Sequence, residues 1–157
     1  MIDSRTAPYA ALLLRVTLGA LFLAHASLKF FVFTPAGTAK FFGSLGFPPE
    51  LAYLVMTVEV LSGIALILGV WTRYAALAGI PILFGAIFTV HGAAGFFFTN
   101  PKGGWEFPAF WAIALLAQAL LRDGAYALRP SAHGRDCHCA LSPPKRFLFV
   151  PQSFHRL

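Results

Sequence analysis

Long runs of apolar residues alternate with short polar segments along this chain. Three runs cover about residues 8–33, 51–70 and 74–98, and a shorter run lies within a fourth predicted helix at about 105–125. A helix needs about 20 predominantly apolar residues to cross the hydrocarbon core of a bilayer, and the first three runs reach that length. The pattern predicts an all-α fold, an integral membrane four-helix bundle over residues 8–128, followed by a separate tail at 129–157.

The first apolar run has features of a secretory signal peptide as well as of a membrane helix. Ala24-His25-Ala26 resembles a small-x-small cleavage site. Arg15, however, interrupts the apolar stretch, and the stretch continues beyond the cleavage site. We therefore expect a retained helix.

Each of the first three predicted helices carries one stripe of small and polar residues at helical spacing. The stripes consist of Arg15, Gly19, Phe22, His25, Ala26 and Lys29; Met56, Glu59, Gly63 and Leu66; and Pro81, Gly85, Phe88 and Gly92. Small residues allow helix backbones to approach closely within a membrane. We therefore expect all three stripes to face the bundle interior, although such glycine faces would equally suit a homodimer. Pro81 is expected to kink the third helix.

The composition indicates that lipid, rather than water, surrounds most of the surface. Apolar residues make up 58% of the chain and charged residues only 11%, whereas typical soluble domains contain about 25% charged residues. The net charge is +6. The basic residues lie mostly outside the apolar runs and on one side of the predicted topology, so the positive-inside rule explains them without a nucleic-acid partner. This bias predicts that both the N- and C-termini are cytoplasmic and that the loops at 34–50 and 99–106 face outward.

Polar residues within the predicted spans are the candidate site residues, because burying each of them in lipid is costly. They are Arg15, His25, Lys29, Glu59, His91 and Gln118, joined by Trp105 and Glu106 near the outer end of the fourth helix. Arg15 and Glu59 are candidates for a buried ion pair, since a guanidinium group presents several donors at once. In the alternative interpretation, such a pair would serve mainly to fix the helix register.

A second cluster is expected near the outer membrane face, where His25, Lys29, His91 and Glu106 would meet beside Trp105. Such a pocket could hydrogen-bond the carbonyl or hydroxyl of a quinone, with histidine moving protons near neutral pH. In the alternative interpretation, Lys29 reaches to the lipid headgroups and each histidine bonds only a backbone carbonyl. Neither histidine has the i,i+4 or H-x-x-H partner of a specific metal site, so no metal and no built-in cofactor are predicted.

The tail carries two features of its own. Cys137-His138-Cys139 could bind a metal or cycle as a dithiol, but C-x-C is a weak signal and the cytoplasm keeps thiols reduced. We assign no role to Cys137 and Cys139. The basic and aromatic patch at 144–149 favours attachment to an anionic leaflet, and a solvated, disordered overhang fits equally well.

Several motifs of the chain resemble those of the DoxX family. They are Arg15 with Leu18-Gly19, His25 to Lys29-Phe30, Val58-Glu59 with Ser62-Gly63, Leu68-Gly69-Val70-Trp71-Thr72-Arg73, Gly103-Gly104-Trp105-Glu106 and the segment 123–128. The resemblance covers about residues 10–128, with Arg129 where an acidic residue is expected. It implies a four-helix protein of bacterial inner (plasma) membranes. Some members resemble subunits of quinone-linked redox systems, including thiosulfate:quinone oxidoreductase, while others join complexes handling thiol and oxidative stress or act as assembly factors.

Two functional hypotheses follow. In the first, the chain is an inner-membrane subunit of a quinone-linked redox or oxidative-stress complex and binds quinone or quinol within the bundle. It lacks the C-x-x-C-H haem motif and the glycine pattern of dinucleotide-binding folds. The redox centre would therefore belong to a protein partner, and the chain would be at most a non-autonomous subunit of an oxidoreductase. In the second hypothesis, it is a non-catalytic membrane scaffold or assembly factor. A transporter is disfavoured, because the spans are few and show no inverted repeat.

Overall fold

The computed structural model describes residues 3, 5–101 and 103–129. Its elements are α1 (Ala7–Ser27), η1 (Leu28–Val32), α2 (Pro35–Ser44), α3 (Glu50–Leu68), α4 (Thr72–Ala86), η2 (Ile87–His91), η3 (Gly92–Ala94) and α5 (Glu106–Leu121). Here η1 and η2 are π-helical turns that continue α1 and α4, and η3 is a short 3-10 helix. The described residues form no β-strand and only one isolated bridge, between Val70 and Arg129. The predicted all-α class is therefore confirmed.

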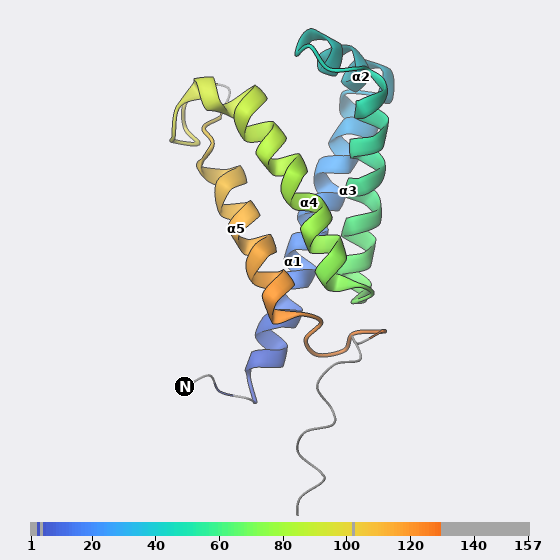
Figure 1. Cartoon of the computed structure of the whole chain (residues 1–157), viewed down its shortest axis with the longest axis vertical. Coiled ribbons are helices and arrows are strands. Elements are labelled where there is room, and N and C mark those ends of the chain that lie inside the picture. Colours follow the sequence, from blue (N-terminus) through green and yellow to red (C-terminus); the bar gives the residue numbers. More distant parts are fainter. Residues whose placement is uncertain (1–2, 4, 102, 130–157) are drawn as a thin grey trace, which may run out of the picture.

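The four long helices lie alongside one another, with α1 packed mainly against α3 and α4 packed mainly against α5 (Figure 1). The N-terminus, the α3–α4 turn and the segment after α5 lie at one end of the bundle. The short helix α2 and the α4–α5 loop lie at the opposite end. From the α3–α4 turn, α3 and α4 diverge toward α2 (Figure 1). The predicted tail, apart from Arg129, lies outside the described residues.

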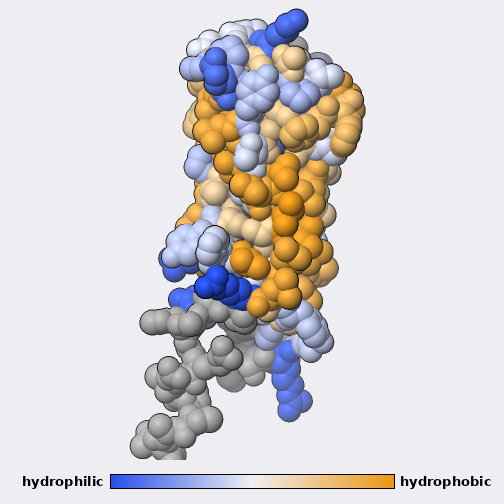
Figure 2. All heavy atoms as spheres, turned by 90° about the vertical axis from the view of Figure 1, so that its right-hand side faces the viewer, coloured by the Kyte–Doolittle hydropathy of each residue, from blue (hydrophilic) through white to orange (hydrophobic). Residues whose placement is uncertain are grey.

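Three of the described helical segments are long and apolar enough to cross a membrane: Ala7–Val32, Glu50–Leu68 and Thr72–Ala94. The fourth, α5, has 16 residues, which at 1.5 Å per residue gives roughly 24 Å against a hydrocarbon core of about 30 Å. On the face shown in Figure 2, hydrophobic residues gather over the middle and hydrophilic residues collect toward the two ends. The chain is thus a multi-pass membrane bundle whose fourth helix is short.

Exposed aromatic residues with polar tips lie near both ends of the long helices. Tyr9, Trp71 and Tyr74 are more than half exposed at the end that holds the N-terminus. At the other end, Tyr53 and Trp105 are 49% and 37% exposed. Trp and Tyr favour the headgroup level on both sides of a bilayer. From Tyr53 to the end of α3 at Leu68 is 15 residues, roughly 22 Å along the helix, and Trp71 follows in the turn after it, so the two aromatic levels are separated by somewhat less than a bilayer core of about 30 Å.

Two predicted helix ends and one predicted loop are wrong. The third predicted helix ends at Ala94 rather than at residue 98, because Gly95 takes a φ of 85°. The fourth ends at Leu121 rather than at residue 125, because Arg122 leaves helical geometry with a φ of 64° and a ψ of −138°. The predicted loop 34–50 contains the helix α2, whose start carries a clear local signal: Thr34 Oγ1 accepts a hydrogen bond from the Gly37 backbone N–H, and Pro35 occupies the first turn.

The inward stripes are confirmed on α1 and α3 and wrong on α4. Arg15, Gly19, Phe22 and Ala26 are buried, and so are Met56, Glu59, Gly63 and Leu66. In contrast, Pro81, Gly85, Phe88 and Gly92 are all exposed. The buried residues of α4 are Thr72, Ala75, Ala76, Gly79 and Leu83. Both faces of α4 therefore carry small residues, and the alanine face packs, because the proline and glycine face lies on the side where α3 diverges.

Close contact between α1 and α3 depends on Gly19 and Gly63. A Cβ added at Gly19 would lie 2.7 Å from the Gly63 carbonyl oxygen and 2.7 Å from Ile67 Cγ1. A Cβ at Gly63 would lie 2.9 Å from the Leu23 side chain. This approach fixes how far α1 is displaced along α3, and it therefore sets which polar residues of the two helices meet.

Replacing Gly19 with alanine should lower Tm in detergent, whereas the same change at Gly85 should not. Overpacking costs about 1–3 kcal/mol, which outweighs the gain of about 1 kcal/mol in helix propensity on replacing glycine. Gly85 is an informative control because a Cβ there meets nothing within 4 Å. Thermal unfolding followed by circular dichroism measures both variants. Equal Tm shifts for the two variants would contradict the close approach at Gly19.

Candidate ligand-binding site

A cavity of about 800 Å³ lies where α3 and α4 diverge and α2 covers the end of the bundle. Its walls come from η1, α2, the α2–α3 loop, α3, α4 and η2. Almost all lining side chains are apolar, and Lys29 and Glu59 are the charged residues among them. An apolar pocket of about 300–1,000 Å³ with a few convergent polar groups is typical of small-molecule sites. The cavity is therefore the candidate site among the described residues.

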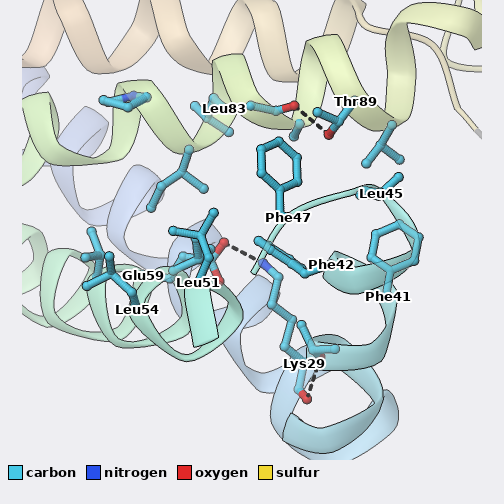
Figure 3. A pocket seen from close by; sticks show the side chains of 18 of the residues that line it. Lys29, Phe41, Phe42, Leu45, Phe47, Leu51, Leu54, Glu59, Leu83 and Thr89 are labelled. Carbon is cyan, nitrogen blue, oxygen red and sulfur yellow. Dashed lines mark hydrogen bonds and ion pairs between the residues drawn. The ribbon is translucent and has the colours of Figure 1, made fainter. Parts of the chain in front are cut away.

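Lys29 and Glu59 form an ion pair at the wall of this cavity. Lys29 Nζ donates a hydrogen bond to Glu59 Oε1 over 2.5 Å (Figure 3). The Glu59 side chain is 5% exposed and that of Lys29 is 22% exposed. Lys29 extends from η1 and Glu59 lies in the middle of α3, so the pair links two membrane-spanning helices. The expected contact between Arg15 and Glu59 is not formed. Glu59 Oε1 pairs with Lys29, and Arg15 donates to carbonyl oxygens at the other end of the bundle.

The pair gives the cavity a defined chemistry. An ammonium group has three donors, of which Glu59 takes one, so Lys29 can donate to a further acceptor. The positive charge is balanced by Glu59, which favours a neutral acceptor such as a carbonyl oxygen over a second anion. Breaking a buried pair by removing one partner is strongly destabilising, whereas replacing both partners with apolar residues is often tolerated.

Three aromatic residues line the cavity at the end of the bundle that α2 covers. Phe41 and Phe42 come from α2, and Phe47 comes from the loop that follows it (Figure 3). These residues are absent from the predicted site, because residues 34–50 were expected to form a loop. The Thr34-Pro35 cap is the signal that could have placed Phe41 and Phe42 on a helix over the bundle.

The two histidines expected in the outer pocket bond the backbone instead. His25 Nδ1 lies 3.0 Å from the Leu21 carbonyl oxygen, and His91 Nδ1 lies 2.9 Å from that of Gly103. This arrangement matches the alternative interpretation for the histidines. The second part of that interpretation is wrong: Lys29 does not extend to the lipid headgroups, because its ammonium group pairs with Glu59.

The remaining outer residues organise the α4–α5 loop. Glu106 Oε1 accepts a hydrogen bond from the Phe98 backbone N–H over 2.8 Å. Trp105 caps α5 and lines a separate shallow hollow of about 320 Å³ with Ile87, Phe88 and Gly92. Neither Trp105 nor Glu106 lines the large cavity. The predicted outer cluster is thus divided, with Lys29 on the cavity side and the other residues at the contact of α1 with α5 or in the loop.

Arg15 and Gln118 lie toward the opposite end of the bundle. Arg15 is 1% exposed, and its Nη2 donates to the carbonyl oxygens of Ala125 and Tyr126 at 3.0 and 3.2 Å. Gln118 Nε2 donates to the Arg122 carbonyl oxygen over 2.6 Å. Both side chains hold the segment after α5, which also bonds Pro8 and the end of α3 through its backbone. Their role here is structural: they hold the segment after α5 against the end of the bundle.

Within the described residues, no group of three or more His, Cys, Asp or Glu side chains could hold a metal ion. The Cys137 and Cys139 thiols lie outside those residues. The polar side chains at the cavity are an amine, a carboxylate and the hydroxyls of Thr38 and Thr89, which bind ligands by hydrogen bonding and charge.

The family model for DoxX matches residues 10–92, just over half of the chain. The chain belongs to the DoxX family. A protein of Bacillus subtilis (strain 168) named "Putative oxidoreductase CatD" is 34% identical over 119 residues, which cover 76% of this chain and 84% of that relative. No solved structure matches. Every residue lining the large cavity falls within the stretch matched by the DoxX model, whereas Trp105, Glu106 and Gln118 fall outside it.

Proposed function

We propose that this DoxX protein is an inner-membrane subunit of a redox system, and that it binds a quinone or quinol in the cavity between α2, α3 and α4. The observation that carries the proposal is the Lys29–Glu59 pair at the wall of an otherwise apolar cavity inside a membrane bundle. A quinone is flat, apolar and neutral, and it has carbonyl oxygens that accept hydrogen bonds. The name of the Bacillus relative supports a link to redox chemistry.

In this role the chain contributes binding and orientation, and a partner protein contributes the electrons. Reduction of a quinone to a quinol takes up two electrons and two protons. Lys29 would donate a hydrogen bond to one quinone oxygen, which draws electron density toward that oxygen. Glu59 would hold the Lys29 ammonium group in place, so it acts as a positioning residue. The cytoplasmic location of both termini, predicted from the basic residues, would place this cavity in the outer half of the membrane.

Purification in detergent from quinone-containing membranes tests the proposal. The wild-type protein should retain quinone, and the Lys29→Met/Glu59→Met double variant should retain at least about tenfold less. A hydrogen bond from a charged group contributes about 1.5–3 kcal/mol, and each 1.4 kcal/mol corresponds to about tenfold in affinity. Quinone extracted from the purified protein is quantified by chromatography.

His91→Ala is the control, because His91 does not line the cavity and should leave the retained quinone unchanged. Equal amounts of retained quinone in the wild type and the double variant would show that Lys29 does not contact the quinone ring. If none of the proteins retains or binds quinone, the proposal fails and the scaffold or assembly function takes its place.

A further inference from the structure

The cavity opens sideways, toward the surface that the bundle presents to lipid. Its wall includes Leu54 of α3 and Pro81 and Gly85 of α4, which are all exposed on membrane-spanning helices. Leu54 is 58% exposed. A ligand that reaches the cavity through this side comes from the hydrocarbon core rather than from water.

The cavity is much larger than a quinone ring requires. A cavity of roughly 150 Å³ accommodates a benzene ring, whereas this cavity has about 800 Å³. The additional space is apolar and extends between α3 and α4, away from Lys29. It therefore suits an alkyl or isoprenoid chain attached to the ring.

Polarity changes across the cavity in one direction. The charged pair lies where η1 meets α3, whereas the edge formed by Pro81 and Gly85 on α4 carries no charge, and the Thr89 hydroxyl beside it already donates to the Gly85 carbonyl oxygen. At that edge Gly85 leaves a gap, since a Cβ built there meets no atom within 4 Å. Because Glu59 neutralises Lys29, an anionic head such as a carboxylate would gain no net charge attraction at the polar end.

From this arrangement we infer that the cavity selects a neutral, long-tailed quinone, and that the tail passes between α3 and α4 beside Gly85. The inference rests on the proposed function and adds the substrate class and the route from the bilayer. The ring would contact Lys29, and the tail would lie along the α4 face formed by Pro81 and Gly85. That face carries the stripe that does not pack within the bundle.

Binding of two probes to the full-length protein in detergent tests the route. The probes are a decyl-substituted benzoquinone and the same ring without the alkyl chain. Gly85→Phe should weaken binding of the decyl compound at least about tenfold relative to the wild type, while binding of the ring alone changes less than about threefold. Ala20→Phe is the matched control: Ala20 is exposed on α1 and does not line the cavity, so neither affinity should change. Tm confirms that both variants are folded.

The possible outcomes separate the two proposals. If Gly85→Phe binds the decyl compound as the wild type does, the route beside Gly85 is wrong, although quinone binding stands. If Gly85→Phe weakens binding of both probes equally, the alkyl tail does not lie beside Gly85. If Gly85→Phe instead converts a dimer to a monomer with unchanged affinities, this face belongs to a second copy of the chain. If a fatty acid with a ten-carbon chain displaces the decyl compound at equal concentration, the site does not select a neutral head. If the wild type binds neither probe, the proposed function itself fails.

Discussion

Lys29→Met should lower the free energy of unfolding by about 3 kcal/mol or more, because it leaves the Glu59 carboxylate without its partner in an apolar interior. Glu59 is 4% exposed and lies in the middle of α3, where no headgroup is within reach. Glu59→Met should cost less, since the Lys29 side chain is 22% exposed and its long stem allows the ammonium group to turn toward the membrane surface. The double variant should return close to the wild type, because two apolar residues leave no buried charge.

Reversible unfolding in detergent, with all four proteins compared, gives the coupling energy between the two positions. If the double variant is as destabilised as the sum of the single variants, the two side chains do not stabilise each other. The same double variant then serves in the quinone experiment, where its expected stability separates loss of binding from loss of fold.

Gly69→Ala should be among the most damaging single-atom changes in the protein. Gly69 ends α3 with a φ of +69°, and a Cβ there would lie 1.5 Å from Arg15 Nη1 and 2.8 Å from Ala127 Cα. The buried Arg15 guanidinium cannot give way without losing its hydrogen bonds to Ala125 and Tyr126. Leaving buried donors without partners costs about 1–3 kcal/mol or more for a charged group, in addition to the backbone strain of about 1 kcal/mol or more.

Gly46→Ala is the control that isolates the clash. Gly46 has a φ of +86°, but a Cβ there meets nothing within 4 Å, so only the backbone strain remains. We expect Gly69→Ala to lower Tm in detergent several times more than Gly46→Ala does. Similar losses for the two variants would mean that contact with Arg15 adds nothing. Arg15→Met combined with Gly69→Ala provides a second comparison, because removing the guanidinium group should make the extra methyl less damaging.

Hydrophobic periodicity was sufficient to predict the membrane class, the positions of the long helices and the buried faces of α1 and α3. It could not predict which residues of those faces meet, because helical spacing shows on which side of a helix a residue lies but not which residue of the neighbouring helix is level with it. Gly19 lies against Gly63, so in antiparallel helices Glu59 is level with about residue 23. At 1.5 Å per residue, Lys29 is then about 9 Å away along the axis and Arg15 about 12 Å away on the other side. Two long side chains span the shorter distance, which explains why Lys29 rather than Arg15 is the partner.

The errors elsewhere have similar physical causes. Arg15 binds carbonyl groups of a segment with no periodic pattern, and backbone acceptors leave no trace in the residue types. On α4 two faces carry small residues, so composition alone could not decide between the stripe with Ala75 and the stripe with Gly85. The ends at Gly95 and Arg122 depend on single backbone angles. The cavity also requires α2 to fold over the bundle, and only the local cap at Thr34 indicated that helix.

The shortness of α5 has a consequence for the lipids around the protein. Beside α1 the bilayer meets a helical segment of 26 residues, and beside α5 it meets one of 16. A span this short is accommodated by local thinning of the bilayer, by flanking residues that reach the headgroups or by association, each at a cost of fractions of a kcal/mol per ångström of hydrophobic mismatch. If the α5 side of one molecule lay next to the short helix of a second molecule, the two would share one region of deformed lipid. Where the bilayer is thinned in this way, it would favour neighbours on the α5 side before any specific contact forms.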